Sequence, residues 1–509
     1  MEMTQKIAVK KGLQMAAFDP ASLRKGVEIA VSKLEHYLSD SSIRGLSLRD
    51  PNDLLRLAKE LFMAPLVQTS PVAIEENLAK IIDLYISTGI QVHSPGYMGR
   101  QFSGAPFLAG VIDLVSSIVS QPSSFYEAGQ LPNVAEQIMA DVLNRFIGYS
   151  PEKFAMITTS GGSLANLTAI LAARNDKFPQ FWRAGITGVG QQTRPVLAVS
   201  EDVHYSVLRA AGILGIGEQQ VVRLPLDKKY RIHIDKVRPI LDDAEQRGCK
   251  VFCIVASSGT TSVGAFDPLD ELADIAQERD CWLHVDAAHG GGLLVSSLLR
   301  HKLKGIEKCD SFCWDAHKTM FMPAVCTLLF YKDKHKSFSA FQQTESQDAS
   351  YVFEKQPSIY TQFDSAKQNF ECTKRPLIMN LWTTWSLYGE KLFVEKIEYL
   401  CSLAREAFQI LSEQKEFEII HEPELNILCF RYCPAIIPKD LTLSEFQVAI
   451  RNRICEEGKF FISKVDIDGV AALRVVFMNH LIEIQHFSML LDEIRNTAIA
   501  LLSKHNGRG

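Results

Sequence analysis

Hydrophobic and polar positions follow two different rhythms along the chain. From residue 20 to about 90, and again from 111 to 149, apolar residues recur every three to four positions, which predicts amphipathic helices. From residue 155 to about 332, short apolar runs such as RPVLAVS, KVFCIVASS and CWLHVDAA alternate with amphipathic segments. Such runs are typical of buried strands in a mostly parallel sheet with helices on both faces.

The remaining segments predict loops and a smaller unit. Residues 93–107, HSPGYMGRQFSGAPF, break the helical period with Pro and Gly and predict an ordered loop. Residues 342–358, QQTESQDASYVFEKQPS, predict a long exposed loop. A helix is expected from Leu377 to about Ser412. We therefore predict a helical N-terminal segment over 1–92, a large α/β domain over 93–376, and a small α+β C-terminal domain over 377–509.

Composition narrows the class of protein. The 509 residues are 47% hydrophobic and 22% charged, which is ordinary for a soluble enzyme. The net charge of -5 gives no basic excess for a nucleic-acid partner. No run of eighteen apolar residues predicts a membrane span, and the first residues show no secretory signal. The 11 cysteines contain no C-x-x-C pair, which favours reduced core thiols in a cytoplasmic protein and no metal site.

Polar motifs follow several predicted strands, at the edge where parallel sheets bind their ligands. In SGGSLAN, Gly162 and Ser163 open a helix whose free N–H groups suit a phosphate. Asp286 of HVDAA ends an apolar strand, either as a structural cap or as the partner of a buried cationic ring nitrogen. His204 of SEDVHYS follows another strand and could equally be a helix-start histidine bonded to backbone.

Lys318, in FCWDAHKTMF, follows a third strand. Its ammonium group either reaches back to water or is held in a site to form a Schiff base, which needs a neutral, desolvated amine. A lysine, a carboxylate, a phosphate cup and a flat group over a ring are together what pyridoxal phosphate requires. We therefore predict that these strand ends bind pyridoxal 5'-phosphate.

HVDAA, followed 32 residues after its aspartate by the lysine of DAHK, resembles the pyridoxal-phosphate-dependent group II amino-acid decarboxylases. This family includes glutamate, cysteine-sulfinate, diaminobutyrate and aromatic amino-acid decarboxylases, and the resemblance runs from about residue 60 to 495. It implies the fold type I aminotransferase architecture, a homodimer with active sites at the interface, and conversion of an L-amino acid to an amine and CO₂.

The resemblance also implies roles for residues around the cofactor ring. Lys318 matches the Schiff-base lysine, and Asp286 matches the partner of the pyridinium nitrogen. The resemblance places Ala288 under the ring and stacks His204 on the other face of the ring. It implies that His204 and Asp286 are catalytic residues. Thr261 of SSGTT matches a threonine near the cofactor.

At the phosphate end, Gly162 and Ser163 match the phosphate-binding turn and His317 matches another phosphate contact. Asp315 stands where many relatives carry asparagine.

Further matches concern the substrate. Tyr351 matches the catalytic tyrosine of a mobile loop, and Arg474 of LRVVFMN matches an arginine that holds the substrate carboxylate in the glutamate branch. In the loop at 93–107, Tyr97, Arg100 and Gln101 could contact the substrate.

Two cationic side chains favour an acidic amino acid as substrate, because Arg100 and Arg474 could each meet a carboxylate. A diamine precursor and an aromatic amino acid stay open as alternative substrates. So do an aminotransferase or an aldehyde synthase on the same fold, and an interaction protein that keeps the fold without the cofactor.

Overall fold

The computed structural model describes residues 17–40, 42, 44–67, 70–185, 194–341, 361–437 and 441–506. Backbone contacts group the chain into two compact units. The larger unit comprises Arg100–Ala435 and Val465–His480, and the smaller one Met1–Gly99, Ile436–Lys464 and Leu481–Gly509. The C-terminal segment thus contributes to both units, and the boundaries expected from sequence pattern at 92/93 and 376/377 stay a prediction.

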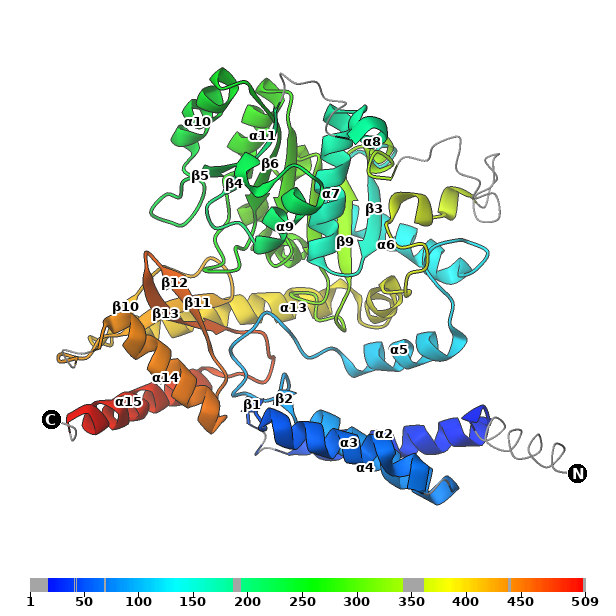
Figure 1. The fold of residues 1–509 in the computed structure, drawn as a ribbon, viewed down its shortest axis with the longest axis vertical. Coiled ribbons are helices and arrows are strands. Elements are labelled where there is room, and N and C mark those ends of the chain that lie inside the picture. The colour runs from blue at the N-terminus through cyan, green and yellow to red at the C-terminus, as the bar shows by residue number, and fades with distance from the viewer. Residues whose placement is uncertain are drawn as a thin grey trace, which may run out of the picture. The chain divides into compact units, whose positions relative to one another are not determined.

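A seven-stranded sheet forms the centre of the larger unit (Figure 1). Its order is β3-β9-β8-β7-β6-β4-β5, and the five strands from β8 to β5 run parallel to one another. β9 runs antiparallel to both β3 and β8. The predicted α/β architecture with a mostly parallel sheet is therefore confirmed. The strands are β3 (Ala155–Thr159), β4 (Arg194–Ser200), β5 (Val221–Leu224), β6 (Cys249–Ser257), β7 (Trp282–Asp286), β8 (Ser311–Asp315) and β9 (Thr327–Tyr331).

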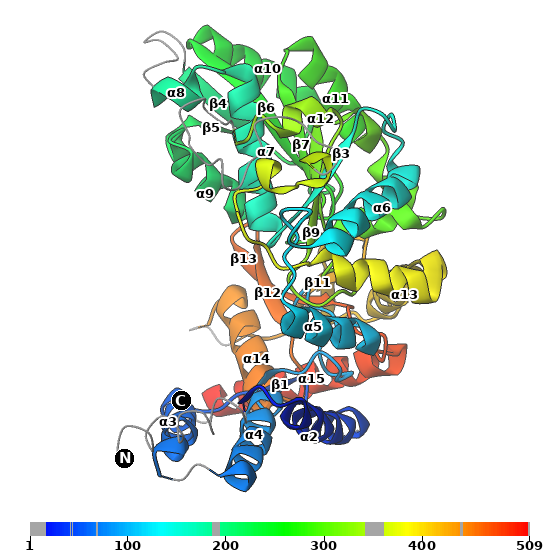
Figure 2. The ribbon, with the colours of Figure 1, turned by 90° about the vertical axis from the view of Figure 1, so that its right-hand side faces the viewer.

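Helices cover both faces of this sheet. α7 packs on β3 and β6 to β9, and its small residues, among them Ala165, Ala169 and Ala172, let it approach the strands closely. α10 and α11 pack on the opposite face, and α6 lies next to β3 (Figure 2). The helices are α5 (Phe107–Val119), α6 (Gln130–Ile147), α7 (Gly162–Lys177), α8 (Phe181–Ala184), α9 (Tyr205–Ile213), α10 (Ile234–Gln246), α11 (Leu269–Glu278), α12 (Lys334–Ser337) and α13 (Ile378–Ser412).

Short 3-10 helices and a second sheet complete the larger unit. The sheet has the order β10-β11-β13-β12, and α13 packs on β10 and β11. Inside α13, Gly389 has a φ of 68°, so the helix is kinked there. The strands are β10 (Phe417–Ile419), β11 (Ile427–Tyr432), β12 (Ser463–Ile467) and β13 (Val470–Val476). The 3-10 helices are η2 (Glu218–Gln220), η3 (Gly290–Val295), η4 (Arg300–Leu303), η5 (Ile306–Lys308), η6 (Thr361–Phe363) and η7 (Ala366–Gln368).

The smaller unit is mainly helical, as the period of residues 20 to 90 predicted. α2 and α3 both pack on α4, and α14 packs on α15. None of the helices in the described residues is both long enough and apolar enough to cross a membrane. The elements are α2 (Pro20–Ser39), β1 (Leu46–Ser47), α3 (Pro51–Val67), α4 (Pro71–Ile86), β2 (Gly89–Ile90), α14 (Leu443–Glu457) and α15 (Ile484–Asn506).

Two predicted loops have different outcomes. Residues 93–107 form no helix or strand before α5 begins at Phe107, which confirms the loop expected there. The loop predicted over 342–358, with Tyr351, lies outside the described residues.

A buried ion pair joins α6, β3 and the segment before α13. The Nζ atom of Lys374 lies 3.5 Å from Oε2 of Glu136 and donates to the carbonyl of Thr158 at 3.0 Å. Oε1 of Glu136 accepts from the Thr158 N–H at 2.7 Å, and Oε2 accepts from the Ser123 hydroxyl at 2.9 Å. Both charged side chains are almost wholly buried, so each depends on the other for compensation.

We expect Glu136→Gln to lower the free energy of unfolding by about 3 kcal/mol, because it leaves the Lys374 ammonium buried without its counter-charge. Urea unfolding followed by tryptophan fluorescence measures this. Adding Lys374→Met should recover part of the loss. Glu60→Gln is the control, since the Glu60–Arg56 pair is exposed, and its removal should change stability by less than about 0.5 kcal/mol. Equal effects of Glu136→Gln and Glu60→Gln would contradict the prediction.

Candidate active site

The carboxyl ends of β4, β6, β7 and β8 border a cavity of about 410 Å³. Its size falls in the range of small-molecule sites. All nine residues expected to bind the cofactor line this cavity, although they come from five separate stretches of sequence: Gly162, Ser163, His204, Thr261, Asp286, Ala288, Asp315, His317 and Lys318.

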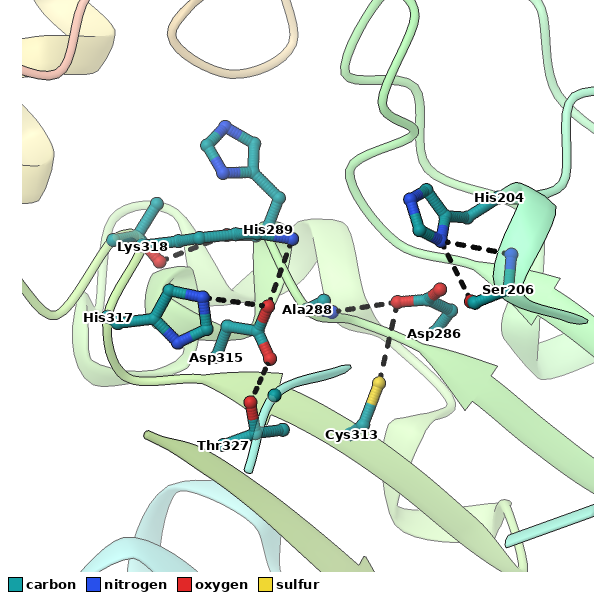
Figure 3. A network of polar contacts seen from close by, with 12 residues as sticks. His204, Ser206, Asp286, Ala288, His289, Cys313, Asp315, His317, Lys318 and Thr327 are labelled. Atoms are coloured by element: carbon teal, nitrogen blue, oxygen red, sulfur yellow. Dashed lines mark hydrogen bonds and ion pairs between the residues drawn. The ribbon is translucent and has the colours of Figure 1, made fainter. Parts of the chain in front are cut away.

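Asp286 ends β7 and is 9% exposed. Its Oδ2 accepts from Nδ2 of Asn166 at 2.8 Å, and its Oδ1 accepts from the Ala288 N–H at 3.1 Å. Burial alone would raise the pKa of Asp286, but the charges of Lys318 and His204 and these hydrogen bonds hold the pKa below its ordinary value. The carboxylate therefore stays ionised inside the cavity wall, where Figure 3 shows it beside Ala288.

A second row of polar groups holds Asn166 in place. Its Oδ1 accepts from Nε2 of His284 at 2.9 Å, and Nδ1 of His284 lies 2.9 Å from Oγ of Ser311. Ser311 also accepts from Nε1 of Trp282 at 2.8 Å. Burial lowers the pKa of His284 to about 4, so this ring is neutral. With its oxygen committed to His284, Asn166 can only present its N–H groups to Asp286.

Sequence reasoning missed Asn166 and His284, although their spacing carried a signal. Asn166 lies four residues after Gly162, which is one helical turn, so both face the same side of α7. His284 lies two residues before Asp286 on a strand, so both side chains point to the same face of the sheet. A polar residue at each of these positions, among apolar neighbours, indicates a shared hydrogen-bond network.

Lys318 follows β8, and its Nζ lies 3.0 Å from Oδ2 of Asp315 (Figure 3). Burial alone would lower the pKa of Lys318, but the carboxylates of Asp315 and Asp286 outweigh it and the pKa is raised. The side chain is only 21% exposed, so the strand-end lysine reaching out to water is wrong. Lys318 therefore carries its proton in this arrangement, and its role as the Schiff-base lysine stays a prediction.

The opposite end of the cavity suits an anion. Gly161, which precedes α7, has a φ of 101°, a conformation that L side chains rarely adopt. A Cβ on Gly162 would lie 3.1 Å from Oδ1 of Asp315, which is a tight contact, so glycine leaves more room than a larger residue at the start of the helix. The first N–H groups of α7 have no partners within the helix and carry its positive dipole end. These are the features of a phosphate cup.

Asp315 and His317 share the floor of this cup. Nδ1 of His317 lies 3.0 Å from the Cys326 carbonyl, and its Nε2 lies 3.5 Å from Oδ2 of Asp315. The Thr327 hydroxyl donates to Oδ1 of Asp315 at 2.5 Å. The aspartate thus contacts three residues around the cup, and it would orient His317 and Lys318 toward a bound phosphate.

His204 caps the start of α9 and is linked to Asp286 through two side chains. Its Nδ1 lies 2.8 Å from Oγ of Ser206, and Nδ2 of Asn166 donates to the same oxygen at 3.0 Å. Ser206 therefore donates its own proton to His204, which leaves Nε2 as the nitrogen that carries hydrogen. Burial lowers the pKa of His204 despite the opposing charge of Asp286. A neutral ring is thus held at the cavity wall.

The expected substrate residues are placed differently. None of Arg474, Arg100 and Gln101 is among the residues that line the cavity, although Phe102 is. Arg474 is buried in β13, where its Nε donates to the Ser262 carbonyl at 2.9 Å. Tyr97 is fully buried in the smaller unit and stacks on Phe461 with 5.9 Å between ring centroids.

A further carboxylate, Asp202, lines the cavity and was missed by the sequence analysis. The Ser262 hydroxyl donates to it, and burial raises its pKa against the opposing charge of Arg474. The sequence did carry a signal for this residue, because Asp202 stands in the motif SEDVHYS, two residues before His204.

Comparisons with known proteins identify similar chains. The family model of the pyridoxal-dependent decarboxylase conserved domain matches residues 62–433. Acidic amino acid decarboxylase GADL1 of Bos taurus is 27% identical over 417 residues, covering 80% of this chain and 78% of that protein. GADL1 of Homo sapiens is 28% identical with the same coverage.

Solved structures show the fold. A crystal structure of mouse CSAD matches with a TM-score of 0.83 at 23% identity, covering 94% of this chain and 99% of that chain. A crystal structure of Oryza sativa TDC with PLP and tryptamine also has a TM-score of 0.83, at 20% identity, covering 95% and 99%. The fold is that of the fold type I pyridoxal phosphate enzymes, as the sequence predicted.

The residues present fit pyridoxal phosphate. One cavity offers a lysine, an ionised carboxylate more than nine-tenths buried, and a glycine-lined helix start with room for an anion. These groups are the donors and acceptors that its aldehyde, ring nitrogen and phosphate require.

We expect borohydride reduction of the protein loaded with pyridoxal phosphate to leave the cofactor attached to Lys318 alone. Peptide mapping by mass spectrometry locates the attachment, and Lys318→Ala should abolish it. Lys396→Ala is the matched control, because burial lowers the pKa of the Lys396 amine and makes it the competing nucleophile. Label on Lys396 in the unaltered protein, or label that persists in Lys318→Ala, would contradict the assignment.

Proposed function

We propose that the chain, which belongs to the pyridoxal-dependent decarboxylases, removes the α-carboxyl group of an acidic L-amino acid and releases an amine and CO₂. The buried, ionised Asp286 is the observation that carries the reaction. An acidic substrate, such as glutamate, aspartate or cysteine sulfinate, is the proposed specificity.

Bound pyridoxal phosphate supplies an electron sink for the pair left behind when CO₂ departs. Asp286 would hold the proton on the ring nitrogen, because an ionised carboxylate stabilises the positive form of that nitrogen. Asn166 and the Ala288 N–H fix both carboxylate oxygens, so little reorganisation is needed as charge develops.

Other side chains bind and orient. The start of α7, with Gly162 and Ser163, would hold the phosphate, and His317 borders the same cup. His204 and Ala288 both line the cavity and would hold the ring between them. Lys318 must give up one proton before its nitrogen can form a bond, and Asp315, 3.0 Å from Nζ, is the acceptor within reach.

Three observations support an acidic substrate. The GADL1 relatives are named acidic amino acid decarboxylases. Arg474 supplies a buried cation behind Asp202 at the cavity wall. Arg100 and Gln101 lie directly before Phe102, which lines the cavity, and Nε2 of Gln101 is buried without a hydrogen-bond partner among the described residues. A carboxylate can accept from such an amide.

A panel of L-amino acids assayed for CO₂ release tests the proposal. We expect glutamate, aspartate or cysteine sulfinate to react with the highest kcat/KM, and amine and CO₂ to form in equal amounts. Asp286→Ala should slow the reaction by about 10²- to 10³-fold. Faster turnover of 2,4-diaminobutyrate or an aromatic amino acid would overturn the acidic specificity, and aldehyde as the main product would overturn simple decarboxylation.

We also propose that two copies of the chain form a homodimer through α5. The helix has one wholly buried residue, Ala109, although most of its side chains are apolar. An exposed apolar face of this kind marks an association surface, and the resemblance to homodimeric enzymes makes a second copy the expected occupant. Its exposed members are Phe107, Leu108, Val111, Leu114, Val115, Ile118 and Val119.

Val115→Asp combined with Ile118→Asp should convert the dimer to a monomer, because two carboxylates would be buried unpaired at the interface. Analytical ultracentrifugation of the loaded enzyme measures the mass. Leu298→Asp is the control, since Leu298 is an exposed leucine outside α5. A monomeric unaltered protein, or a dimer that survives both α5 substitutions, would refute this interface.

A further inference from the structure

His289 lines the cavity but has no role in the cofactor-binding set described above. It lies three residues after Asp286, directly before η3, and is 2% exposed. Its backbone carbonyl accepts from the Thr319 hydroxyl at 3.0 Å, which ties it to the segment that follows Lys318. The ring lines the same cavity as Lys318, and an amino group must enter this cavity to reach the lysine.

Neighbouring groups determine which nitrogen of His289 carries the proton. Nε2 lies 2.8 Å from Oδ1 of Asn426. Nδ2 of Asn426 donates to the Phe477 carbonyl at 2.6 Å, so the amide oxygen must face the histidine. An amide oxygen only accepts hydrogen bonds, and Nε2 of His289 is therefore the donor. Nδ1 of the neutral ring is left without hydrogen.

Nδ1 is buried and has no hydrogen-bond partner among the described residues. Figure 3 shows the ring with one nitrogen turned toward the Lys318 side chain and the other turned away. Burial lowers the pKa of His289 well below its ordinary value, and the positive charge of Lys318 lowers it further. An acceptor that cannot readily take up a proton is thus held beside the reactive lysine.

We propose that Nδ1 of His289 accepts a hydrogen bond from the α-amino group of the incoming amino acid and positions that nitrogen beside Lys318, where it would replace the lysine nitrogen on the carbonyl carbon of the cofactor. The proposal rests on amino-acid exchange at Lys318, which belongs to the proposed function, and not on an acidic substrate.

The chemistry of the exchange explains why such an acceptor is useful. An amino acid at neutral pH carries an ammonium group, and this donor has to approach a lysine that is also a cation. The Asp315 carboxylate is already engaged by Lys318 and Thr327. A neutral acceptor can bind the arriving N–H without adding positive charge, and a buried acceptor left unpaired costs free energy until a donor arrives.

Two amide substitutions separate the nitrogens of the ring. In His289→Asn the side-chain amide takes about the place of Nδ1 and can offer its oxygen as acceptor. In His289→Gln the amide reaches the place of Nε2, keeps a bond to Asn426, and leaves the place of Nδ1 without a polar group. Steady-state kinetics on the best substrate of the amino-acid panel, together with absorbance titration of cofactor binding, compares the two variants.

We expect His289→Gln to raise KM by about ten- to a hundredfold, as for the loss of a hydrogen bond to a charged group, with a smaller change in kcat. His289→Asn should restore most of the loss, and cofactor affinity should change less than twofold in both. Equal KM values for the two variants would overturn the proposal. Weakened cofactor binding without a change in KM would also overturn it, because Nδ1 would then contact the cofactor.

A second measurement needs no turnover. In protein labelled with nitrogen-15 in its histidines and lacking cofactor, NMR distinguishes protonated from unprotonated ring nitrogens, and His289→Asn assigns the His289 signals. We expect Nε2 to be protonated and Nδ1 unprotonated, with no titration near the ordinary histidine pKa. A proton on Nδ1 at neutral pH would overturn the proposal even if decarboxylation itself is confirmed.

Discussion

The site depends on keeping the Asp286 carboxylate ionised at the end of a buried strand. A charge in such a place is costly unless it is paired and hydrogen-bonded. Asn166 and the Ala288 N–H satisfy its oxygens, and Lys318 supplies the opposing charge. The geometry of α7 against the sheet follows from this requirement, because Asn166 reaches the carboxylate only if the helix lies close to β7.

The hydrogen-bond network around Asp286 extends over four elements, β7, α7, β8 and α9. His284 and Ser311, on the adjacent strands β7 and β8, orient Asn166. The amide of Asn166 also donates to Ser206, which in turn is hydrogen-bonded to His204 at the start of α9. Networks of this kind are rigid when every member is satisfied. His204, Asp286 and Ala288, which would border the cofactor ring, therefore belong to one hydrogen-bond network.

Two carboxylates act on Lys318, and they explain why its amine is charged. Asp315 and Asp286 raise its pKa although the side chain is largely buried. Burial lowers the pKa of the neighbouring His289, and the charge of Lys318 lowers it further, so that ring stays neutral. The distribution of charge thus leaves Nδ1 of His289 unprotonated at the place where an amino group would arrive. At another part of the cavity wall, the charge of Arg474 acts on Asp202.

The sequence alone determined the elements and the identity of the site. The apolar run RPVLAVS forms β4 with the same first and last residues. The bounds agree because a strand that is buried on both faces reads as a continuous apolar run. Strand-end placement also brought Gly162, His204, Asp286 and Lys318 to one cavity. Tertiary structure decided the protonation states. The charge of Lys318 and the tautomer of His289 depend on Asp315 and Asn426, whose distances from them are set by packing between strands and not by spacing along the chain.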